Sequence, residues 1–276
     1  LHWQVVGDNG NTISEGMQTV DCPPLQSAFV EIGRIVYPDN IGEAYLNLSW
    51  KAKKPKPFID TNYEVAYDQF VIEVKKKYAY SETPASGKAF MLVDDVTGAL
   101  KSYTFNSVEM LASPVTLSLY RPATDNDNRD RYGARMWEKA GLDNLTQRVK
   151  TIKRSKNTTI AVIDILNNEN IIVGDAIFEY ALKNDGSLSI RTSFNPDTAI
   201  IKSMARVGIT FQMPDDYQRI TYLGRGESET YADRKENGKI GIYSTSVEET
   251  FHSYAMPQAT GNHTDMRWAI LTDKEG

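Results

Sequence analysis

The sequence is poor in several features that would otherwise define its class. It has one cysteine, Cys22, among 276 residues, so neither an intrachain disulfide nor a metal site built from several thiolates can form. No run approaches the ~18 apolar residues that a membrane-spanning helix needs. Basic residues number 31 against 36 acidic ones, for a net charge of −5. The chain therefore lacks the positive field expected of a protein whose main ligand is nucleic acid.

Motifs of known catalytic machinery are missing as well. The sequence has no G-x-S-x-G, no H-E-x-x-H and no phosphate-binding glycine loop, and Gly224-Arg225-Gly226 lacks the third glycine of a dinucleotide fingerprint. The histidines are too scattered for a metal triad. His252 with Glu248 or Glu249 could form an acid/base pair, but we expect these residues at the surface. We predict no metal and no cofactor in this chain.

The amino terminus carries no signal segment, that is, no basic stretch followed by an apolar one. The chain begins at Leu1 rather than Met, which we interpret as a cut made inside a longer protein. Neither feature indicates a compartment, so cytoplasm and periplasm both stay open.

What the sequence does contain is a series of short alternating runs of apolar and polar residues, typical of strands. Two pairs of such runs flank tight-turn sequences, Asp8-Asn9-Gly10-Asn11 and Asn184-Asp185-Gly186, and each predicts a hairpin. Further turns are expected at 96–99 and 236–238. Only 132–139 has a short helical pattern. Without β-α-β alternation, the sequence predicts an all-β chain rather than a parallel sheet or a (β/α) barrel.

The spacing of the predicted strands changes near residues 73–77. About six candidate strands within 1–74 match the size of an immunoglobulin-like sandwich, whereas longer and more widely spaced runs in 75–276 predict a larger sandwich. Lysine-rich stretches lie at 51–57 and 75–77. We expect both to be solvated edges or linkers rather than binding patches.

Two polar clusters follow predicted strands, at 121–127 and at 254–268. Both combine amides, carboxylates, an arginine and aromatic rings. This mixture suits a sugar, because planar polar groups bond its hydroxyls and rings cover its apolar face. A buried polar network that pins two long loops explains the same composition, so both interpretations stay open.

At these clusters the chain resembles the carboxy-terminal part of the large β-galactosidases of glycoside hydrolase family 2. Residues 222–234 are similar to the family's W/Y-x-G-x-G-P-x-E-x-Y-x-D-R signature, and residues 257–268 to its P-Q-E-x-G-N-R-x-x-x-R-W segment. Residues 121–127 resemble its R-x-P-x-D-N-D stretch, with one residue missing or shifted near the proline. Matches to the preceding immunoglobulin-like domain are Leu1-His2-Trp3, Pro23-Pro24 and 66–70. All of them follow the family's order along the chain.

The resemblance implies a fold and a role. The fold is an immunoglobulin-like β-sandwich, 1–74, followed by a galactose-mutarotase-like β-supersandwich, 75–276, that stops before its usual end. The family's two catalytic glutamates lie on an upstream (β/α) barrel, about 5–5.5 Å apart, so the resemblance implies neither of them, and no catalytic residue, in this chain. The implied partners are that barrel, in the same polypeptide, and a β-galactoside. A homo-oligomeric parent, and cations bound to it outside this region, stay open.

The same resemblance implies residue roles. Loops of the supersandwich help to roof the sugar pocket of the barrel, and the candidates for its rim are Arg121, Asp125, Asn126, Asp127, Gln258 and Asn262. A second set is expected to be architectural: Gly224, Gly226, Glu229, Tyr231, Asp233, Arg234, Arg267 and Trp268. Its glycines suit a tight turn at a strand end, and Glu229, Asp233 and Arg234 suit an ion-pair network.

Several positions depart from the family pattern. Glu227 stands where proline is usual, Ala259 where glutamate is usual, and His263 where arginine is common. Residues 128–131 replace a glycine-bearing mobile loop, so we expect no flexible hinge there. Trp268 matches a structural position, and the family's sugar-stacking tryptophan lies further along the chain.

Four functions stay open. The one we favour is a non-catalytic part of a retaining β-galactosidase. The others are the small subunit of a two-chain β-galactosidase, a stand-alone carbohydrate-binding module, and an aldose epimerase, which only the shared fold suggests.

Overall fold

The computed structural model describes residues 1–74, 87–129 and 131–273 of the chain. Within these ranges most of the regular structure is strand, every strand pairing is antiparallel, and the strands form five sheets. The predicted all-β class is confirmed. No helix in the described ranges is both long enough and apolar enough to cross a membrane.

The chain forms two compact units, which we describe separately. Unit 1 consists of Leu1–Tyr80, Gln218–Phe251 and Gly261–Gly276, and unit 2 of Ser81–Tyr217 and His252–Thr260. We expected a domain boundary after residue 74, and the segment that follows it lies outside the described residues, so the boundary stays a prediction. The lysine triplet 75–77 lies in the same segment. The other basic stretch, 51–57, is described, and its four lysines are exposed, as expected.

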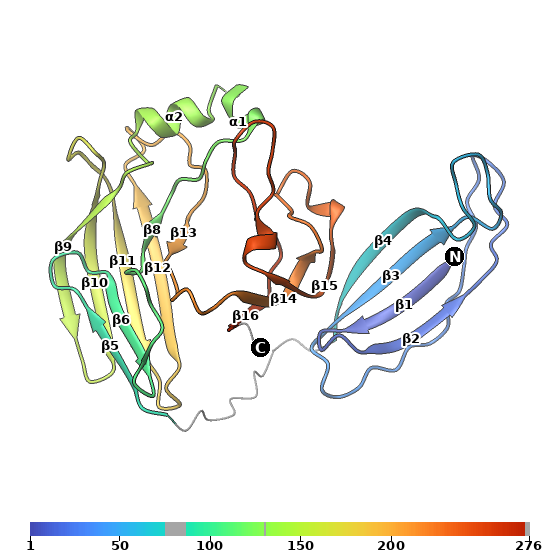
Figure 1. Ribbon diagram of the computed structural model, residues 1–276, viewed down its shortest axis with the longest axis horizontal. Helices are drawn as coiled ribbons and strands as arrows, with labels where there is room; N and C mark the ends of the chain where they lie inside the picture. The colour runs from blue at the N-terminus through green and yellow to red at the C-terminus, as the bar shows by residue number, and fades with distance from the viewer. Residues whose placement is uncertain (75–86, 130, 274–276) are drawn as a thin grey trace. The chain divides into compact units, whose positions relative to one another are not determined.

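Unit 1 contains a four-stranded sheet with order β2-β1-β3-β4 and a three-stranded sheet with order β15-β14-β16 (Figure 1). The bounds are β1 His2–Gly7, β2 Thr12–Met17, β3 Glu43–Lys51, β4 Glu64–Glu73, β14 Arg219–Gly226, β15 Lys239–Ser246 and β16 Trp268–Thr272, with short 3₁₀ turns η1 Lys235–Asn237 and η2 Glu248–Thr250.

Alternation along the strands gives the first sheet two different faces. On one face Val5, Ala44 and Ile41 are buried, and Ile35 is among the apolar side chains packed against them. Residues 18–42 contribute to this core without forming a strand, so 1–74 contain four strands rather than about six. Three prolines in that segment explain the difference, because proline cannot donate to a strand ladder; they are Pro23, Pro24 and Pro38.

The opposite face of the first sheet packs on the second sheet. Tyr45 on β3 is 1% exposed and packs with Leu223 and Ile240, against which Trp268 also packs. Beside it the side-chain amide of Gln69 accepts a hydrogen bond from the Ile240 N–H at 2.7 Å and donates one to the Ile240 carbonyl at 2.8 Å. Gln69 thus bonds β15 in the way that a neighbouring strand would.

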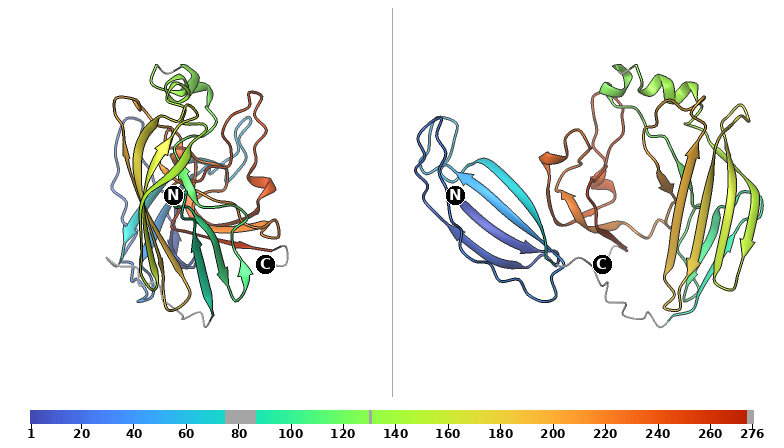
Figure 2. Two further views of the ribbon diagram at one scale, coloured as in Figure 1. Left: turned by 90° about the vertical axis from the view of Figure 1, so that its left-hand side faces the viewer. Right: turned by 180° about the vertical axis from the view of Figure 1, so that it is seen from behind.

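Unit 2 holds a four-stranded sheet with order β12-β11-β10-β9, the three-stranded sheet β5-β6-β7 and the pair β13-β8 (Figures 1 and 2). The bounds are β5 Ala89–Val93, β6 Leu100–Phe105, β7 Val108–Glu109, β8 Thr116–Ser118, α1 Asp125–Arg129, α2 Ala134–Lys139, β9 Thr146–Arg154, β10 Thr158–Leu166, β11 Ile172–Leu182, β12 Leu188–Pro196 and β13 Gly208–Thr210.

One apolar cluster joins the sheets of unit 2. Ile163 on β10 and Phe178 on β11 are fully buried, and Leu100 on β6 belongs to the same cluster. Tyr180 is also fully buried, and its hydroxyl donates to the Gly98 carbonyl at 3.0 Å. Burial raises the pKa of the Tyr180 hydroxyl, so this group stays a neutral donor. The sheet thereby holds the β5–β6 turn in place.

Both predicted hairpins are confirmed. β1 and β2 meet across 8–11, where Gly10 has φ +80°, and β11 and β12 meet across 183–187, where Gly186 has φ +87°. A side chain would be strained at either glycine. The helix α2 lies inside the predicted segment 132–139, whereas α1 occupies a stretch in which the sequence predicted no helix.

The Gln69 contact gives a stability test. Gln69→Ala removes both partners of the backbone groups of Ile240, a residue that is 4% exposed. We expect the free energy of unfolding of unit 1 to fall by about 2–4 kcal/mol, because two buried polar groups lose their hydrogen bonds. Urea unfolding followed by tryptophan fluorescence measures the change. Gln26→Ala, at an exposed site, is the matched control, and equal effects of the two variants would contradict the assignment.

Candidate functional site

The first polar cluster, 121–127, forms a turn at the start of α1, and an ion pair between Arg121 and Asp127 closes this turn. Arg121 donates from Nη1 to Asp127 Oδ2 at 2.6 Å and from Nη2 to Oδ1 at 3.3 Å. Its guanidinium carbon lies 5.4 Å from the centre of the Trp137 ring. The side chains of Arg121 and Asp127 are only 21% and 18% exposed. The two rim candidates therefore bond each other and fix the turn.

The helix α1 begins with a capping box. Asp127 Oδ2 accepts from the backbone N–H of Thr124 at 2.7 Å, and Thr124 Oγ1 accepts from the N–H of Asp127 at 3.4 Å. These reciprocal bonds satisfy N–H groups that a helix start leaves free. The Thr-x-x-Asp spacing at 124–127 was the signal in the sequence that could have predicted α1.

Asp125 and Asn126, the rim candidates that lie between Arg121 and Asp127 in the chain, are exposed to solvent. Asp125 pairs with Arg129 at 3.0 Å, and both side chains are largely exposed. Asn126 is exposed, and its side chain makes no hydrogen bond within the described ranges. Asn128 and Arg129 continue the helix. Asp125 and Asn126 are thus the accessible polar groups of this turn.

The local contacts set the charge of Asp127. Partial burial raises the pKa of its carboxyl, but hydrogen bonds from Arg121 and Thr124 outweigh burial, so the pKa of Asp127 lies below its ordinary value. Asp127 is therefore ionised at neutral pH, and the pair with Arg121 is charged on both sides.

The second polar cluster divides between the units. Gln258, half-buried, lies in loop 252–260 of unit 2, which reaches the same end of that unit as α1 (Figures 1 and 2). Asn262 belongs to unit 1. Its side-chain Nδ2 donates to the Thr230 carbonyl at 2.7 Å, and its backbone carbonyl accepts from the Thr230 N–H at 2.7 Å. Asn262 therefore holds the 226–234 turn in place.

The histidine–glutamate pair considered from the sequence has other partners. Within unit 1, Glu249 Oε2 accepts hydrogen bonds from Thr245 at 2.9 Å and Ser246 at 3.0 Å. Within unit 2, the His252 ring lies 4.4 Å from the ring of Tyr254. Glu249 and His252 are both exposed, as expected.

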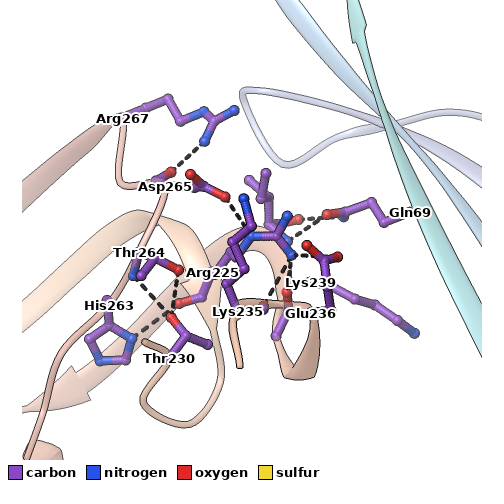
Figure 3. A network of polar contacts seen from close by, with 12 residues as sticks. Gln69, Arg225, Thr230, Lys235, Glu236, Lys239, His263, Thr264, Asp265 and Arg267 are labelled. Atoms are coloured by element: carbon purple, nitrogen blue, oxygen red, sulfur yellow. Dashed lines mark hydrogen bonds and ion pairs between the residues drawn. The ribbon is translucent and has the colours of Figure 1, made fainter. Parts of the chain in front are cut away.

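The signature glycines Gly224 and Gly226 lie on β14 around Arg225, which is the centre of a polar network (Figure 3). Arg225 Nε donates to Asp265 Oδ2 at 2.6 Å, and Nη1 donates to the Gly238 carbonyl at 2.9 Å. The Arg225 side chain is 12% exposed. A Cβ on Gly226 would lie 2.7 Å from the Tyr222 hydroxyl oxygen, so the close packing here requires glycine.

His263, where the family has arginine, joins the same network. Its Nδ1 lies 3.0 Å from the Tyr222 hydroxyl and 3.1 Å from the Arg225 carbonyl. Tyr222 is fully buried. Burial, together with Tyr243 and Glu227 nearby, raises the pKa of Tyr222 to about 12. The Tyr222 hydroxyl is therefore neutral, and the histidine contact is structural.

The expected ion-pair network forms with two of its three members. Glu229 Oε1 accepts from Arg234 Nη2 at 2.5 Å, and Glu229 Oε2 accepts from the Gly261 N–H at 2.7 Å. The guanidinium carbon of Arg234 lies 5.5 Å from the Tyr231 ring centre. Asp233 is exposed and lies outside this pair. Glu229 links the signature turn to the start of the 261–268 segment.

Arg267 and Trp268 fasten β16 to the first sheet. Arg267 donates to Glu43 from Nε at 2.9 Å and from Nη2 at 3.2 Å, a two-pronged ion pair. Burial opposes the charge on both groups, but the mutual bonds outweigh it: they lower the pKa of Glu43 and raise the pKa of Arg267. Sequence reasoning missed Glu43, Tyr45 and Gln69, because nothing local marks a residue whose partner lies far along the chain.

No metal centre forms in the part of the chain that the structure describes. Within residues 1–74, 87–129 and 131–273, no group of three or more His, Cys, Asp or Glu side chains could hold an ion.

The Asp127 pair predicts a pH effect. Because the folded-state pKa of Asp127 is lowered, its contribution to stability is complete above the unfolded value of about 3.9 and is lost as pH falls through the folded value. Asp127→Asn should therefore lower the thermal midpoint at pH 7, and its difference from the parent sequence should shrink towards pH 3. Asp125→Asn, at a largely exposed site, is the control. A difference that is the same at both pH values would rule out this role for Asp127.

The Glu43–Arg267 pair predicts non-additive variants. Arg267→Lys loses the two-pronged geometry, and we expect it to lower the free energy of unfolding of unit 1 by about 1–3 kcal/mol. Glu43→Gln should cost a similar amount, and the double variant should cost less than the sum, because each single change breaks the same bonds. A double-mutant cycle in urea measures the coupling. Strict additivity would mean that the two side chains do not interact.

Comparison with protein families gives two matches. Residues 85–276 match the model described as the beta galactosidase small chain, and residues 1–73 match beta-galactosidase, domain 4.

Several similar proteins carry the same name. The chain is 30% identical over 251 residues to the beta-galactosidase of Priestia megaterium, covering 85% of this chain and 24% of that protein. It is 26% identical over 304 residues to beta-galactosidase BgaC of Bifidobacterium adolescentis, covering 97% and 28%. It is 28% identical over 216 residues to the beta-galactosidase of Kluyveromyces lactis, covering 71% and 20%. The chain thus spans about a quarter of the length of these relatives. The first family match covers well over half of this chain, and we conclude that the chain belongs to the β-galactosidase small-chain family, with a β-galactosidase domain 4 preceding the small-chain region.

Proposed function

We propose that this chain is a non-catalytic part of a retaining β-galactosidase, whose parent enzyme hydrolyses terminal β-D-galactosides such as lactose. The observation that carries the proposal is the pair of family matches, which together cover nearly the whole chain. It is supported by relatives that are named β-galactosidases and of which the chain covers only 24% and 28%. The proposed domains are 1–74 and 75–276.

In this proposal the catalytic carboxylates belong to a (β/α) barrel elsewhere in the same polypeptide. A retaining glycosidase needs two carboxyl groups about 5–5.5 Å apart, one of which exchanges protons. The partly buried carboxylates Glu43 and Asp127 each bond an arginine instead, and the pKa of each is lowered. A carboxylate that is held as an ion pair is a poor proton donor. These contacts suit structural roles.

The rim of the sugar pocket is proposed at α1 and loop 252–260. Asp125 and Asn126 are exposed and could bond sugar hydroxyls, while Arg121 and Asp127 hold the turn that presents them. Gln258 offers a half-buried amide on loop 252–260. Asn262 bonds Thr230, so we propose a positioning role for it rather than a sugar contact.

A two-chain arrangement is the second candidate, because the matching family model is described as a small chain. In that arrangement the chain would be a separate subunit beside a larger one that carries the barrel.

Activity measurements test the proposal. The purified chain should release no nitrophenol from a nitrophenyl β-galactoside above a buffer control. The polypeptide that carries the barrel should gain turnover when this chain is fused to it, and Asp125→Ala with Asn126→Ala should reduce that gain by more than about tenfold. Turnover by the chain alone, surviving removal of contaminating enzyme, would overturn the non-catalytic assignment. Restoration by addition in trans would favour the two-chain arrangement.

A further inference from the structure

Unit 1 contains a stretch of chain, 28–32, that has the side-chain pattern of a strand. Val30 and Ile32 are half-buried. Phe29 and Glu31, which alternate with them, are exposed. This two-residue alternation is typical of a strand with one covered face, and phenylalanine, valine and isoleucine favour strands. Residues 28–32 are therefore suited to a sheet, although they belong to none of the five sheets that the described ranges form.

The backbone around this stretch is almost unpaired. Among the residues that the structure describes, no group accepts a hydrogen bond from a backbone N–H of 27–37. The Glu31 carbonyl has a partner, the side-chain Nε2 of Gln18, at 2.8 Å. The three prolines of the 18–42 segment lie outside 27–37, so every residue of the stretch has an N–H to donate. Unpaired N–H and C=O groups along a strand are the groups that a further strand bonds.

An open cleft of about 680 Å³ lies along the same stretch. Residues 18–21 and 28–33 line it. Within the described part of the chain, these two runs are joined by a single hydrogen bond, the one from Gln18 to Glu31. The space beside 28–33 is thus not filled by a neighbouring strand.

The side chains around 28–32 do not protect it from pairing. Phe29 is 95% exposed, and Val36 is 77% exposed. Proteins usually protect an exposed strand edge with lysine or proline, and 27–37 contain neither. The charged residues there are Glu31 and Arg34. The stretch therefore has the features of an acceptor for a further strand rather than those of a protected edge.

These groups determine the chemistry of the occupant. Main-chain N–H and C=O groups at strand spacing are matched by another extended main chain, as in the addition of a strand to a sheet edge. Side chains opposite Val30 and Ile32 should be apolar, because opposite residues share a face. The side chain opposite Glu31 should be basic or neutral, since like charges directly opposite each other are destabilising.

We propose that 28–32 bind a strand supplied by the rest of the parent polypeptide, which makes 28–32 the fifth strand of residues 1–74. This inference rests on the proposed function, in which the chain is part of a longer β-galactosidase. It is supported by the relatives, of which the chain covers only 24% and 28%. A strand tethered in the same polypeptide reaches an effective concentration on the order of millimolar. It therefore pairs in preference to a second copy of this chain, which is more dilute.

Amide hydrogen exchange of the isolated 276-residue chain and of the parent polypeptide tests the proposal. We expect the amides of 28–32 to exchange at nearly the unprotected rate in the isolated chain, because none of them donates a hydrogen bond within the described ranges. In the parent polypeptide their exchange should be at least about 100-fold slower. The amides of 44–49 are the reference and should be slow in both proteins, since β3 pairs on both sides. Equally fast exchange of 28–32 in both proteins would overturn the proposal.

Proline variants show whether the protection comes from strand pairing. Alternate N–H groups of a strand point to the same edge, so either Val30→Pro or Glu31→Pro removes a donor to the added strand. The more severe of the two should reduce the protection of 28–32 in the parent polypeptide by at least about tenfold. Lys54→Pro is the matched control, because Lys54 is exposed and its N–H bonds no group in the described residues. Protection that survives both variants would mean burial without pairing and would overturn the strand assignment.

Two further outcomes separate the partner and the function. Protection of 28–32 in the isolated chain that rises with its concentration would identify a second copy as the partner and would overturn the assignment to the parent polypeptide. A parent polypeptide that hydrolyses a nitrophenyl β-galactoside while 28–32 exchange freely would overturn the strand pairing alone. A parent polypeptide in which 28–32 are protected but which releases no nitrophenol would support the pairing and contradict the proposed function.

Discussion

The structure of unit 1 depends on one contact in which a side-chain amide bonds the backbone groups that a neighbouring strand would otherwise bond. The amide of Gln69 bonds both the N–H and the carbonyl of Ile240, so a residue on β4 takes the place of a missing strand beside β15. Buried backbone groups require partners, and this is how β15 obtains them where it meets another sheet. Tyr45 fills the space next to this contact, and the Glu43–Arg267 pair closes its edge. The two sheets are joined by directional bonds around a small apolar centre.

The family signature gains a physical meaning from these contacts. Arg225 donates hydrogen bonds to the β14–β15 connection and to the 264–266 segment. Glu229 accepts hydrogen bonds from Arg234 and from the Gly261 N–H. Arg267 donates to Glu43 on the first sheet. The polar residues that looked suited to sugar in the sequence divide accordingly. Arg121, Asp127 and Asn262 spend their hydrogen bonds on the protein. Asp125 and Asn126 remain exposed.

Sequence patterns predicted the elements whose residues lie close together in the chain. Alternation and turn residues identified the hairpins around Gly10 and Gly186, and α2 lies where the helical pattern was expected. The capping box at Thr124 was equally readable and would have predicted α1. Glu43 and Gln69 could not be recognised in this way. Their partners lie 224 and 171 residues away, and an isolated Glu or Gln on a strand reads as a solvent-facing residue. Composition likewise could not distinguish free polar groups from paired ones, because both use the same residue types.

The distance between Glu43 and Arg267 also has a consequence for synthesis. Most of unit 2 is a single stretch, Ser81–Tyr217, inserted between the first and second parts of unit 1. The first sheet therefore leaves the ribosome with Tyr45 and Gln69 uncovered, and at about 5–20 residues per second it waits on the order of ten seconds for β14–β16. During that interval the ring of Tyr45 and the amide of Gln69 lack the contacts that they make with Leu223 and Ile240. Unit 2 can fold first, since its strands are close together in the chain, and closing the long loop then adds the last sheet to the first. Unit 1 can therefore be completed only after β16 has been made.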